Sequence, residues 1–480
     1  MKLKLVIVLI AVFSINYTFS QKNNQLNFHP DGTFKIAQFT DIHWDENSEN
    51  SVKTLKIIQN VLTTENPDFA VITGDIITTN PTKKGWKAIA DPFIDSETPW
   101  TVTLGNHDSE ADISRHEIFE ILKELPYFIG EEGNVSGVGN FVVPILNHKE
   151  NKNATLLFFL DSKDYAVNQE ISHYDWMKFD QIKWFREKSD YYAELNNNTP
   201  VPSLAFFHIP LPEYEFIADD ATTIGDQFEG IASSEINSGL FASMIDKDNI
   251  MGVFAGHDHD NNYIGIYKNI ALGFGQVTGL DAYGQLDRGA RIIILHENKT
   301  QFETYIRNEK EKKFHYHYPS GVPEPDSTTI FFKSTDVKNL KQGIHYKYYE
   351  GNVQSVQEIS SLKVKKLGIM PNISIDSAQV EDYFAFKYEG WLNIEVEEYY
   401  RFYLTSDDGA VLWIDGQKII DNDGTHSAHR KEAIVPLEAG LHRLKIEYFE
   451  SYMGQQLEVG FSSPHNKSRE IPNELLYFEK

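Results

Sequence analysis

From residue 34 onward, short apolar runs of strand length alternate with polar turns and with segments in which apolar residues recur at helical spacing. In the first helical segment these residues are Val52, Leu55, Ile58 and Leu62, and Asn66-Pro67 is expected to end the helix. Alternating strands and helices predict an α/β layered domain, and near-continuous apolar runs predict strands buried on both faces. The six expected strands are 34–39, 69–72, 100–104, 155–160, 204–207 and 250–254.

The last part of the sequence, from about residue 343, has a different pattern. Apolar and polar residues alternate in short stretches such as 400–405 and 442–449, and turn sequences such as Asp415-Gly416 separate them. No helical spacing lies between the last of these stretches. A period of two interrupted by turns predicts an all-β sandwich or barrel.

Between the two patterns, around 309–336, the sequence is charged and aromatic and contains Pro319, Gly321 and Pro325. These residues favour turns and irregular structure, so a linker is expected here. The chain has 480 residues, too many for one ordinary hydrophobic core, which also favours two domains. We expect a first domain over 21–310, a linker over 311–342 and a second domain over 343–480.

The first twenty residues have the layout of a secretory signal peptide. Lys2 and Lys4 precede an apolar run over 5–13, and small and polar residues follow around Ser20. The run is too short to span a bilayer comfortably, although a retained membrane anchor is the alternative. We therefore expect an exported protein, which is periplasmic, secreted or at the cell surface and has no transmembrane segment after signal removal.

Composition narrows the classes of ligand. The 44 Lys and Arg residues are outnumbered by 70 Asp and Glu, and the formal net charge of -26 would repel bulk nucleic acid and anionic membranes. A small anionic substrate remains compatible with this charge, because a bound metal can dominate the field within one cleft. The chain has no cysteine, so any metal must be bound by oxygen and imidazole nitrogen.

Polar clusters follow five of the six expected strands of the first domain. In open α/β sheets the carboxyl ends of strands share an edge where ligands bind, so these clusters are expected to converge on one site. The clusters are Asp41 with His43, Gly74-Asp75, Gly105-Asn106-His107-Asp108, His208, and Gly256-His257-Asp258-His259.

Residues of these types suit a pair of metal ions. Phosphate esters require accelerations of up to about 10²¹, whereas one general acid or base supplies only about 10²- to 10⁴-fold. Two ions about 3.5 to 4 Å apart activate a water and neutralise the phosphate oxygens. Asp75, which follows the flexible Gly74, is the natural bridge between such ions, and Asn106 offers a neutral carbonyl oxygen.

The ordered set of clusters resembles the calcineurin-like metallophosphoesterase superfamily, over roughly 34–307. The resemblance implies an α/β layered metallophosphoesterase sandwich that binds two divalent ions, which could be zinc, manganese or iron. It implies His107 as the acid or phosphate-binding donor, oriented by Asp108, with Asn106 also near the substrate. It places Asp41, His43, Asp75 and His259 on one ion, and Asp75, Asn106, His208 and His257 on the other.

The segment 206–214, which contains His208-Ile209-Pro210, looks more like the branch related to purple acid phosphatases. Where the purple enzymes carry a tyrosine three residues beyond the aspartate, this chain has Thr78. The departure puts the charge-transfer colour and an obligatory ferric ion in doubt. His43 supplies the ligand that non-purple members have in the first cluster.

The second domain resembles the PA14 β-sandwich, on the sequence 405–416 followed by 437–449. Some sugar-binding relatives hold Ca²⁺ with adjacent aspartates, so the resemblance makes Asp407 and Asp408 candidates for binding calcium or glycan. The alternative is that both only form a turn. A PA14-like domain on an exported enzyme would tether it to glycan or cell-wall material and raise the local substrate concentration.

A few further residues have two interpretations each. Arg115 and His116 are candidates for substrate contact or members of a solvated helix face. Trp44 either shapes the site or packs in the core. His315 and His317 superficially resemble a metal-binding tract, and a linker strand is the default interpretation.

The pattern as a whole predicts an exported binuclear-metal phosphoesterase that hydrolyses phosphate mono- or diesters through a metal-activated water. One alternative narrows the substrate to nucleotides or phospholipid headgroups. Another is an adhesin-like glycan-binding protein whose phosphoesterase half is inactive. The complete ligand set argues against the second alternative, because a decayed site should have lost at least one ligand.

Overall fold

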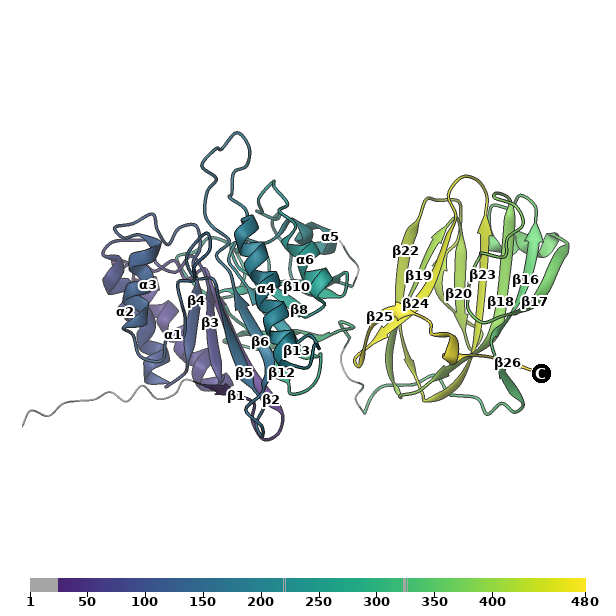
Figure 1. Cartoon of the computed structure of the whole chain (residues 1–480), viewed down its shortest axis with the longest axis horizontal. Coiled ribbons are helices and arrows are strands. Elements are labelled where there is room, and N and C mark those ends of the chain that lie inside the picture. The colour runs from purple at the N-terminus through teal and green to yellow at the C-terminus, as the bar shows by residue number, and fades with distance from the viewer. Residues whose placement is uncertain (1–24, 219, 221, 323–324, 326) are drawn as a thin grey trace, which may run out of the picture.

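The computed structural model describes residues 25–480 apart from 219, 221, 323, 324 and 326, and the chain forms two lobes (Figure 1). The expected signal peptide over 1–20 lies outside the described residues. Within the part that is described, no helix has the length and apolar character needed to cross a membrane.

The first lobe is a sandwich of two β-sheets with helices on its outer faces (Figure 1). One sheet has the order β1 (Leu26–Asn27), β5 (Phe141–Leu146), β6 (Asn153–Phe159), β7 (Ser203–Phe206), β8 (Ile250–Ala255), β10 (Ile270–Phe274), β9 (Ile264–Tyr267). The other has the order β14 (Lys312–Tyr318), β13 (Phe302–Asn308), β12 (Gly289–His296), β2 (Thr33–Thr40), β3 (Phe69–Thr73), β4 (Trp100–Thr103), and β11 (Gln276–Val277) pairs with β2. The helices are α1 (Glu49–Glu65), α2 (Thr82–Asp95), α3 (Arg115–Lys123), α4 (Phe179–Leu195), α5 (Glu215–Ala218), α6 (Leu240–Lys247) and the 3-10 helix η1 (Pro212–Tyr214).

Alternate residues of the central strands enter two different cores. In β6, Phe158 packs with Trp184 of α4, whereas Phe159 packs with Phe69 of the opposite sheet, with ring centroids 6.4 Å apart. Both side chains are fully buried, which explains why the strand reads as a continuous apolar run. The expected α/β layered sandwich is confirmed.

The parallel strands give the first lobe a common edge. Strands β2, β3 and β4 are parallel neighbours in one sheet, and β6, β7 and β8 are parallel neighbours in the other. Each set therefore ends on one side of its own sheet. The loops that follow these strands carry the polar clusters found in the sequence.

Helix α1 begins and ends where local chemistry predicts. The Ser48 side chain accepts a hydrogen bond from the backbone N–H of Asn50 and caps the helix, and Asn66 ends it with a φ of 45°. Its apolar face differs from the predicted one in the first turns, because Val52 is 54% exposed. Ser51 and Thr54 face inward instead and bond to the segment after β11, at Asp281 and Leu280.

Part of the expected linker forms two strands, one in a sheet of each lobe. Strand β14 pairs antiparallel with β13, and the short strand β15 (Leu340–Gln342) pairs with β26 (Leu476–Glu479) of the second lobe. The physical reason is a period of two, because Tyr316 and Tyr318 are buried and alternate with His315 and His317. The two histidines thus lie in a strand, as their default interpretation stated.

The second lobe is an all-β sandwich, as predicted, with its core between two antiparallel sheets. The larger sheet has the order β15, β26, β18 (Phe384–Ile394), β23 (Gly440–Glu450), β20 (Ala410–Ile414), β21 (Gln417–Asn422), with β16 (Ile344–Glu350) paired to β18 and β17 (Val364–Met370) to β16. The smaller sheet has the order β22 (His429–Leu437), β19 (Glu398–Asp407), β24 (Gln456–Ser463), β25 (Asn466–Glu470). Two 3-10 helices, η2 (Val356–Ser361) and η3 (Asn473–Leu475), lie in the connections.

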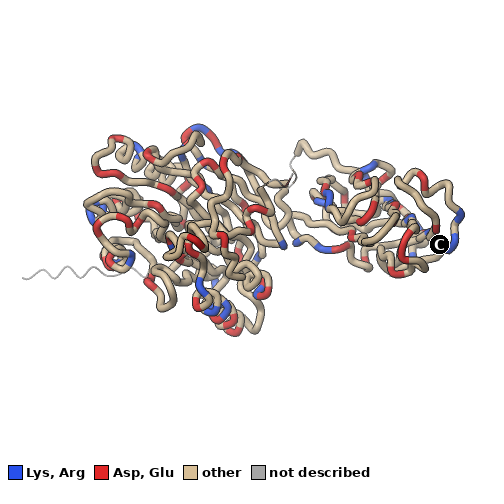
Figure 2. Tube along the Cα trace, turned by 90° about the horizontal axis from the view of Figure 1, so that it is seen from above, with Lys and Arg blue, Asp and Glu red and all other residues tan. Residues whose placement is uncertain are grey.

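Charged residues of both signs are interspersed over both lobes (Figure 2). The lobes also contact one another, since Lys467 Nζ lies 2.7 Å from Asp248 Oδ1 and Gln301 Nε2 donates to the Pro464 carbonyl at 2.5 Å.

Candidate metal centre

The predicted ligands follow strands of both sheets. Asp41 and Asp75 follow β2 and β3 of one sheet, whereas His208 and His257 follow β7 and β8 of the other. The loop after β4 supplies Asn106. These ligands, which are distant in sequence, thereby lie together beyond the carboxyl ends of strands from both sheets.

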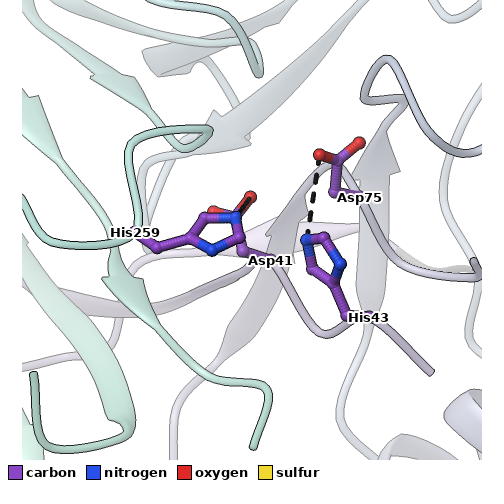
Figure 3. A group of neighbouring side chains, drawn as sticks. All are labelled: Asp41, His43, Asp75 and His259. Atoms are coloured by element: carbon purple, nitrogen blue, oxygen red, sulfur yellow. Dashed lines mark ion pairs between the residues drawn. The ribbon is translucent and has the colours of Figure 1, made fainter. Parts of the chain in front are cut away.

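Two groups of ligand-type side chains share one carboxylate. Asp41, His43, Asp75 and His259 each offer an atom within 4.8 Å of the others (Figure 3), and so do Asp75, His208 and His257. The aspartates and histidines in each group are those that the resemblance assigned to each ion. Asp75 belongs to both groups, which is the position a bridging ligand would take.

Close contacts define each group. His259 Nε2 lies 3.3 Å from Asp41 Oδ1, and His43 Nε2 lies 3.9 Å from Asp75 Oδ2. The same Asp75 oxygen lies 3.1 Å from His208 Nε2, and His257 Nδ1 lies 3.2 Å from His208 Nε2. Nitrogen and oxygen atoms thus face one another across short gaps in a buried space.

The site contains buried polar atoms that have no hydrogen-bond partner. Leaving such an atom unpaired costs about 1 to 3 kcal/mol, so a concentration of them indicates a missing partner. Oxygen and imidazole nitrogen are donors that suit divalent zinc, manganese or iron, so the residues present fit a pair of cations. The unpaired atoms that support this are Asp41 Oδ1, His43 Nε2 and Asn106 Oδ1, whereas the unpaired nitrogens of His257 and His259 are Nε2 and Nδ1, which are not the atoms that face the other ligands.

Neighbouring groups hold the ligands in place. Thr73 O accepts from His208 Nδ1 at 2.7 Å, which directs Nε2 toward Asp75. Thr40 Oγ1 and the His257 backbone N–H donate to Asp41 Oδ2 at 2.7 and 3.1 Å, so the other oxygen, Oδ1, is left to the site.

The backbone at the site is unusual. Asp41, His43, Asp75 and His257 have φ values of 51°, 48°, 50° and 78°, in the left-handed region that such residues seldom adopt. Strained backbone of this kind costs about 1 to 3 kcal/mol per residue and is typical of functional sites. Gly74, with a φ of 84°, is required because a Cβ there would lie 2.3 Å from His208 Nδ1.

Burial and charge set the protonation of the ligands. Burial opposes ionisation of Asp41, but His259 and His208 outweigh it and lower its pKa to about 2. Burial lowers the pKa of His43 to about 4 and that of His257 to about 3, so both rings are neutral and able to bind a cation. Burial disfavours the charged form of His208 as well, yet Asp75 and Asp41 raise its pKa to about 9, so a cation that binds Nε2 has to displace the proton there.

The expectation that Asp108 orients His107 is wrong. Asp108 is fully buried and accepts from the backbone N–H groups of Gly105, Ile76 and Ile77 at 2.7, 2.7 and 3.1 Å, so it holds two loops together. His107 Nδ1 instead lies 2.7 Å from Glu110 Oε2, one turn further along the chain. Spacing alone gave no reason to prefer Glu110 over the adjacent aspartate.

One interpretation of Arg115, a place on a solvated helix face, is wrong, because its side chain is only 12% exposed. The structure does not favour substrate contact either, since the two Nη atoms donate to Asp161 Oδ1 at 2.6 Å and to the carbonyls of Gly105 and Leu104. Arg115 therefore fixes the loop that carries Asn106 and His107.

Of the remaining candidate residues, His116 lies at the surface and Trp44 lies in the core. The His116 side chain is 71% exposed, as a solvated helix face requires. Trp44 is buried and forms a parallel bridge with Ile77, so it packs in the core. Thr78 Oγ1 donates to the Trp44 carbonyl at 3.3 Å.

Three tyrosines beside the ligands escaped the sequence reasoning. Tyr165 accepts from Asn106 Nδ2 at 3.2 Å, Tyr174 packs its ring on His257 at 4.7 Å, and Tyr283 stacks on His259 at 3.9 Å. They lie in loops, between β6 and α4 and between β11 and β12. No periodic pattern marks such positions.

Comparison with known proteins agrees with this geometry. Residues 34–261 match the family model of the calcineurin-like phosphoesterases. A relative called "Probable inactive purple acid phosphatase 29", from Arabidopsis thaliana, is 32% identical over 58% of this chain and 80% of its own length. The chain belongs to the calcineurin-like phosphoesterase family. Three of its similar proteins are named as probable inactive purple acid phosphatases, and another is named as a phosphatase.

This calcineurin-like phosphoesterase has three further similarities, to two phosphatases and to one domain family. The phosphatase DCR2 of Saccharomyces cerevisiae is 31% identical over 58% of this chain and 54% of its own length. A solved dimetal phosphatase from Danio rerio has 11% identity and a TM-score of 0.43, covering 58% of this chain and 98% of the other. Residues 340–475 match the PA14 domain, so the second lobe is a PA14 sandwich.

The PA14 lobe of this calcineurin-like phosphoesterase brings Asp407 and Asp408 together with Glu450, with oxygens within 4.8 Å of one another. Burial and the charge of Asp408 raise the pKa of Glu450 to about 8, and its Oε1 has no hydrogen-bond partner. Asp408 also accepts from the backbone N–H groups of His426 and Ser451 at 2.9 and 2.8 Å. Asp407 and Asp408 thus form part of a turn. The arrangement of their carboxylates with that of Glu450 is also compatible with a bound cation.

Proposed function

We propose that the first lobe is a binuclear-metal phosphoesterase that hydrolyses phosphate mono- or diesters. The observation that carries this proposal is the pair of buried ligand groups that share Asp75, together with their unpaired nitrogen and oxygen atoms. Membership of the calcineurin-like phosphoesterase family supports it.

In this proposal Asp41, His43, Asp75 and His259 bind one cation, and Asp75, Asn106, His208 and His257 bind the other. Two cations, when bound, lower the pKa of a water and neutralise the phosphate oxygens during an in-line displacement. The protein contributes preorganised ligands, because Thr40, Thr73 and Gly74 fix their positions before any substrate arrives.

His107 is the residue that we assign to proton transfer. Its side chain is 35% exposed, so a substrate can reach it, and its backbone N–H donates to Asp75 Oδ1 at 2.9 Å. Burial lowers the pKa of His107, but Asp75 and Glu110 outweigh this and raise it overall. Glu110 holds Nδ1, so Nε2 is the nitrogen that can donate to the leaving oxygen.

The proposal includes export and attachment to a surface. The signal-like sequence over 1–20 supports export to the periplasm, the cell surface or the medium. The PA14 match supports a role for the second lobe in binding glycan or cell-wall material, with Asp407, Asp408 and Glu450 as the calcium-binding candidates. Attachment would keep the enzyme close to a surface-bound substrate.

The names of several relatives favour a second candidate, a binding protein with an inactive phosphoesterase half. Three Arabidopsis thaliana relatives carry the words "probable inactive" in their names. The complete ligand set of this chain favours the enzyme, because none of the seven predicted ligands has been replaced.

An assay separates the two candidates. Purified protein is incubated with p-nitrophenyl phosphate and with bis-p-nitrophenyl phosphate, with and without a chelator, and then with added Mn²⁺ or Zn²⁺. The enzyme proposal predicts hydrolysis that the chelator abolishes and the metal restores. Metal-loaded protein that cleaves neither ester would support the inactive binding protein instead.

A further inference from the structure

The loop between β6 and α4 makes an ordered cover over part of the metal centre. Tyr165 and Tyr174 face one another in an isolated antiparallel bridge, and their rings stack with centroids 5.7 Å apart. The Ala166 N–H donates to the His173 carbonyl at 3.0 Å, and the Asp175 N–H donates to the Asp164 carbonyl at 2.8 Å. These contacts join the two arms of the loop, although it belongs to neither sheet.

This loop contacts two ligands of the same proposed cation. The Tyr174 ring packs on His257, and the Tyr165 hydroxyl accepts a hydrogen bond from Asn106 Nδ2 at 3.2 Å. By accepting from Nδ2, Tyr165 orients the amide so that Asn106 Oδ1 is the atom left unpaired in the buried site.

The direction of that hydrogen bond leaves the Tyr165 proton available. A phenolic hydroxyl both accepts and donates, and Asn106 uses only its acceptor side. Tyr165 is half-buried, and its ring lies 6.4 Å from that of His107, the proposed proton donor. The hydroxyl thus lies beside Asn106, near the place where the ester must bind for His107 to reach it.

A hydroxyl fixed beside the proposed metal ligands is suited to binding a phosphate oxygen. Arg115, the arginine or lysine nearest to Asn106 in sequence, uses its two Nη atoms to donate to Asp161 and to two backbone carbonyls. A phosphate ester has several oxygens that accept hydrogen bonds, and a donor fixed in advance stabilises the charge on them.

We infer that Tyr165 is a further substrate-binding residue, whose hydroxyl accepts from Asn106 and donates its own proton in a hydrogen bond to a non-bridging phosphate oxygen. The inference rests on the proposed function. It means that the β6–α4 loop recognises the phosphate group of the substrate, whichever alcohol forms the ester.

The test uses Tyr165→Phe, which keeps the stacked ring and removes only the hydroxyl. Tyr191→Phe is the matched control, because it removes a hydroxyl from an exposed tyrosine on α4. Calorimetry measures Mn²⁺ binding and then the binding of inorganic phosphate at saturating Mn²⁺, and kcat/KM for p-nitrophenyl phosphate is measured separately. Phosphate binding is independent of turnover, so it can be read even in a protein that does not hydrolyse esters.

For Tyr165→Phe we expect phosphate affinity and kcat/KM to fall about ten- to a hundredfold at saturating Mn²⁺, the effect of losing a hydrogen bond to a charged group. The control should match the wild type. Unchanged phosphate affinity would overturn the inference, and weaker Mn²⁺ binding alone would reduce Tyr165 to a positioning residue for Asn106. A wild-type protein that binds Mn²⁺ and phosphate without hydrolysis would contradict the proposed function and leave the Tyr165 comparison valid, whereas one that binds no phosphate would overturn both.

Discussion

Asp75 Oδ2 lies 3.1 Å from His208 Nε2, and the two side chains are 2% and 0% exposed. They follow strands of different sheets, so their contact fastens the two halves of the sandwich at the metal centre. Burying a carboxylate and an imidazole together is costly unless both are paired or bind a metal. The relationship makes Asp75 the residue on which the geometry of both ligand groups depends.

Replacement of Asp75 by Asn should therefore remove metal and activity together. The substitution preserves size but takes away the charge that both proposed cations share. We expect the metal content measured by elemental analysis to fall by at least half, and hydrolysis to fall below detection. Asp95→Asn, an exposed change at the end of α2, is the control and should match the wild type. An Asp75→Asn protein with wild-type metal content would refute the bridging role.

Glu110→Gln should slow catalysis without loss of metal. The change removes the charge that faces His107 Nδ1 at 2.7 Å and that raises the pKa of this histidine. We expect kcat to fall about tenfold, which is less than the about 10²- to 10⁴-fold that one general acid contributes, because His107 itself remains. The pH profile of kcat should shift to lower pH on its alkaline side. A profile identical to that of the wild type would argue that Glu110 does not act on His107.

Asp108→Ala should destabilise the fold, because three backbone N–H groups lose their acceptor in a buried place. We expect the free energy of unfolding to fall by roughly 2 to 4 kcal/mol. Urea titration followed by circular dichroism measures this. Full stability with lost turnover would instead restore the catalytic role that the sequence suggested.

Arg115→Met should likewise act on stability rather than on substrate affinity. Breaking a buried pair such as Arg115 with Asp161 leaves the carboxylate without its counter-charge, with only backbone N–H donors, and typically costs about 3 to 5 kcal/mol. Where the variant remains folded, KM should stay near the wild-type value. A large rise in KM with unchanged stability would show that the arginine binds substrate after all.

The PA14 lobe should lose stability as the pH rises past neutral. Burial lowers the pKa of His442, but its hydrogen bond to Asp415, 2.7 Å away, and the nearby Glu438 raise it overall above the ordinary value of 6.5. The folded state therefore retains a proton that the unfolded state releases. This stabilisation is complete below about pH 6.5 and is lost as the pH rises through the folded pKa.

Urea titrations at about pH 6 and about pH 9 should show this loss in the wild type and a smaller loss in His442→Gln. His116→Gln, at an exposed position of the first lobe, serves as the control. Equal pH dependence in His442→Gln and the wild type would exclude the ion pair as its source.

The strands and the metal ligands could be predicted because each depends on local information. A strand buried on both faces, such as β6, must be apolar throughout, and the residue that follows it must leave the core. Aspartate and histidine at successive strand ends therefore indicated a shared site, and the resemblance to the metallophosphoesterases implied that His43 and His259 belong to one group, as the structure has them.

The partners of these residues could not be predicted in the same way. Whether His107 meets Asp108 or Glu110 depends on the path of one turn, and both carboxylates are close in sequence. Tyr165 reaches Asn106 from a loop whose course no periodic pattern defines. The helical spacing of apolar residues did not predict that Ser51 and Thr54 of α1 face inward. These two side chains form hydrogen bonds with a loop that is distant in sequence.

The most direct test of the account is the metal stoichiometry of active protein. Elemental analysis of purified, hydrolytically active chain should find about two divalent ions per chain, and removal of both by a chelator should abolish activity until metal is restored. Active protein that contains no stoichiometric metal, and that the chelator does not inhibit, would contradict the account.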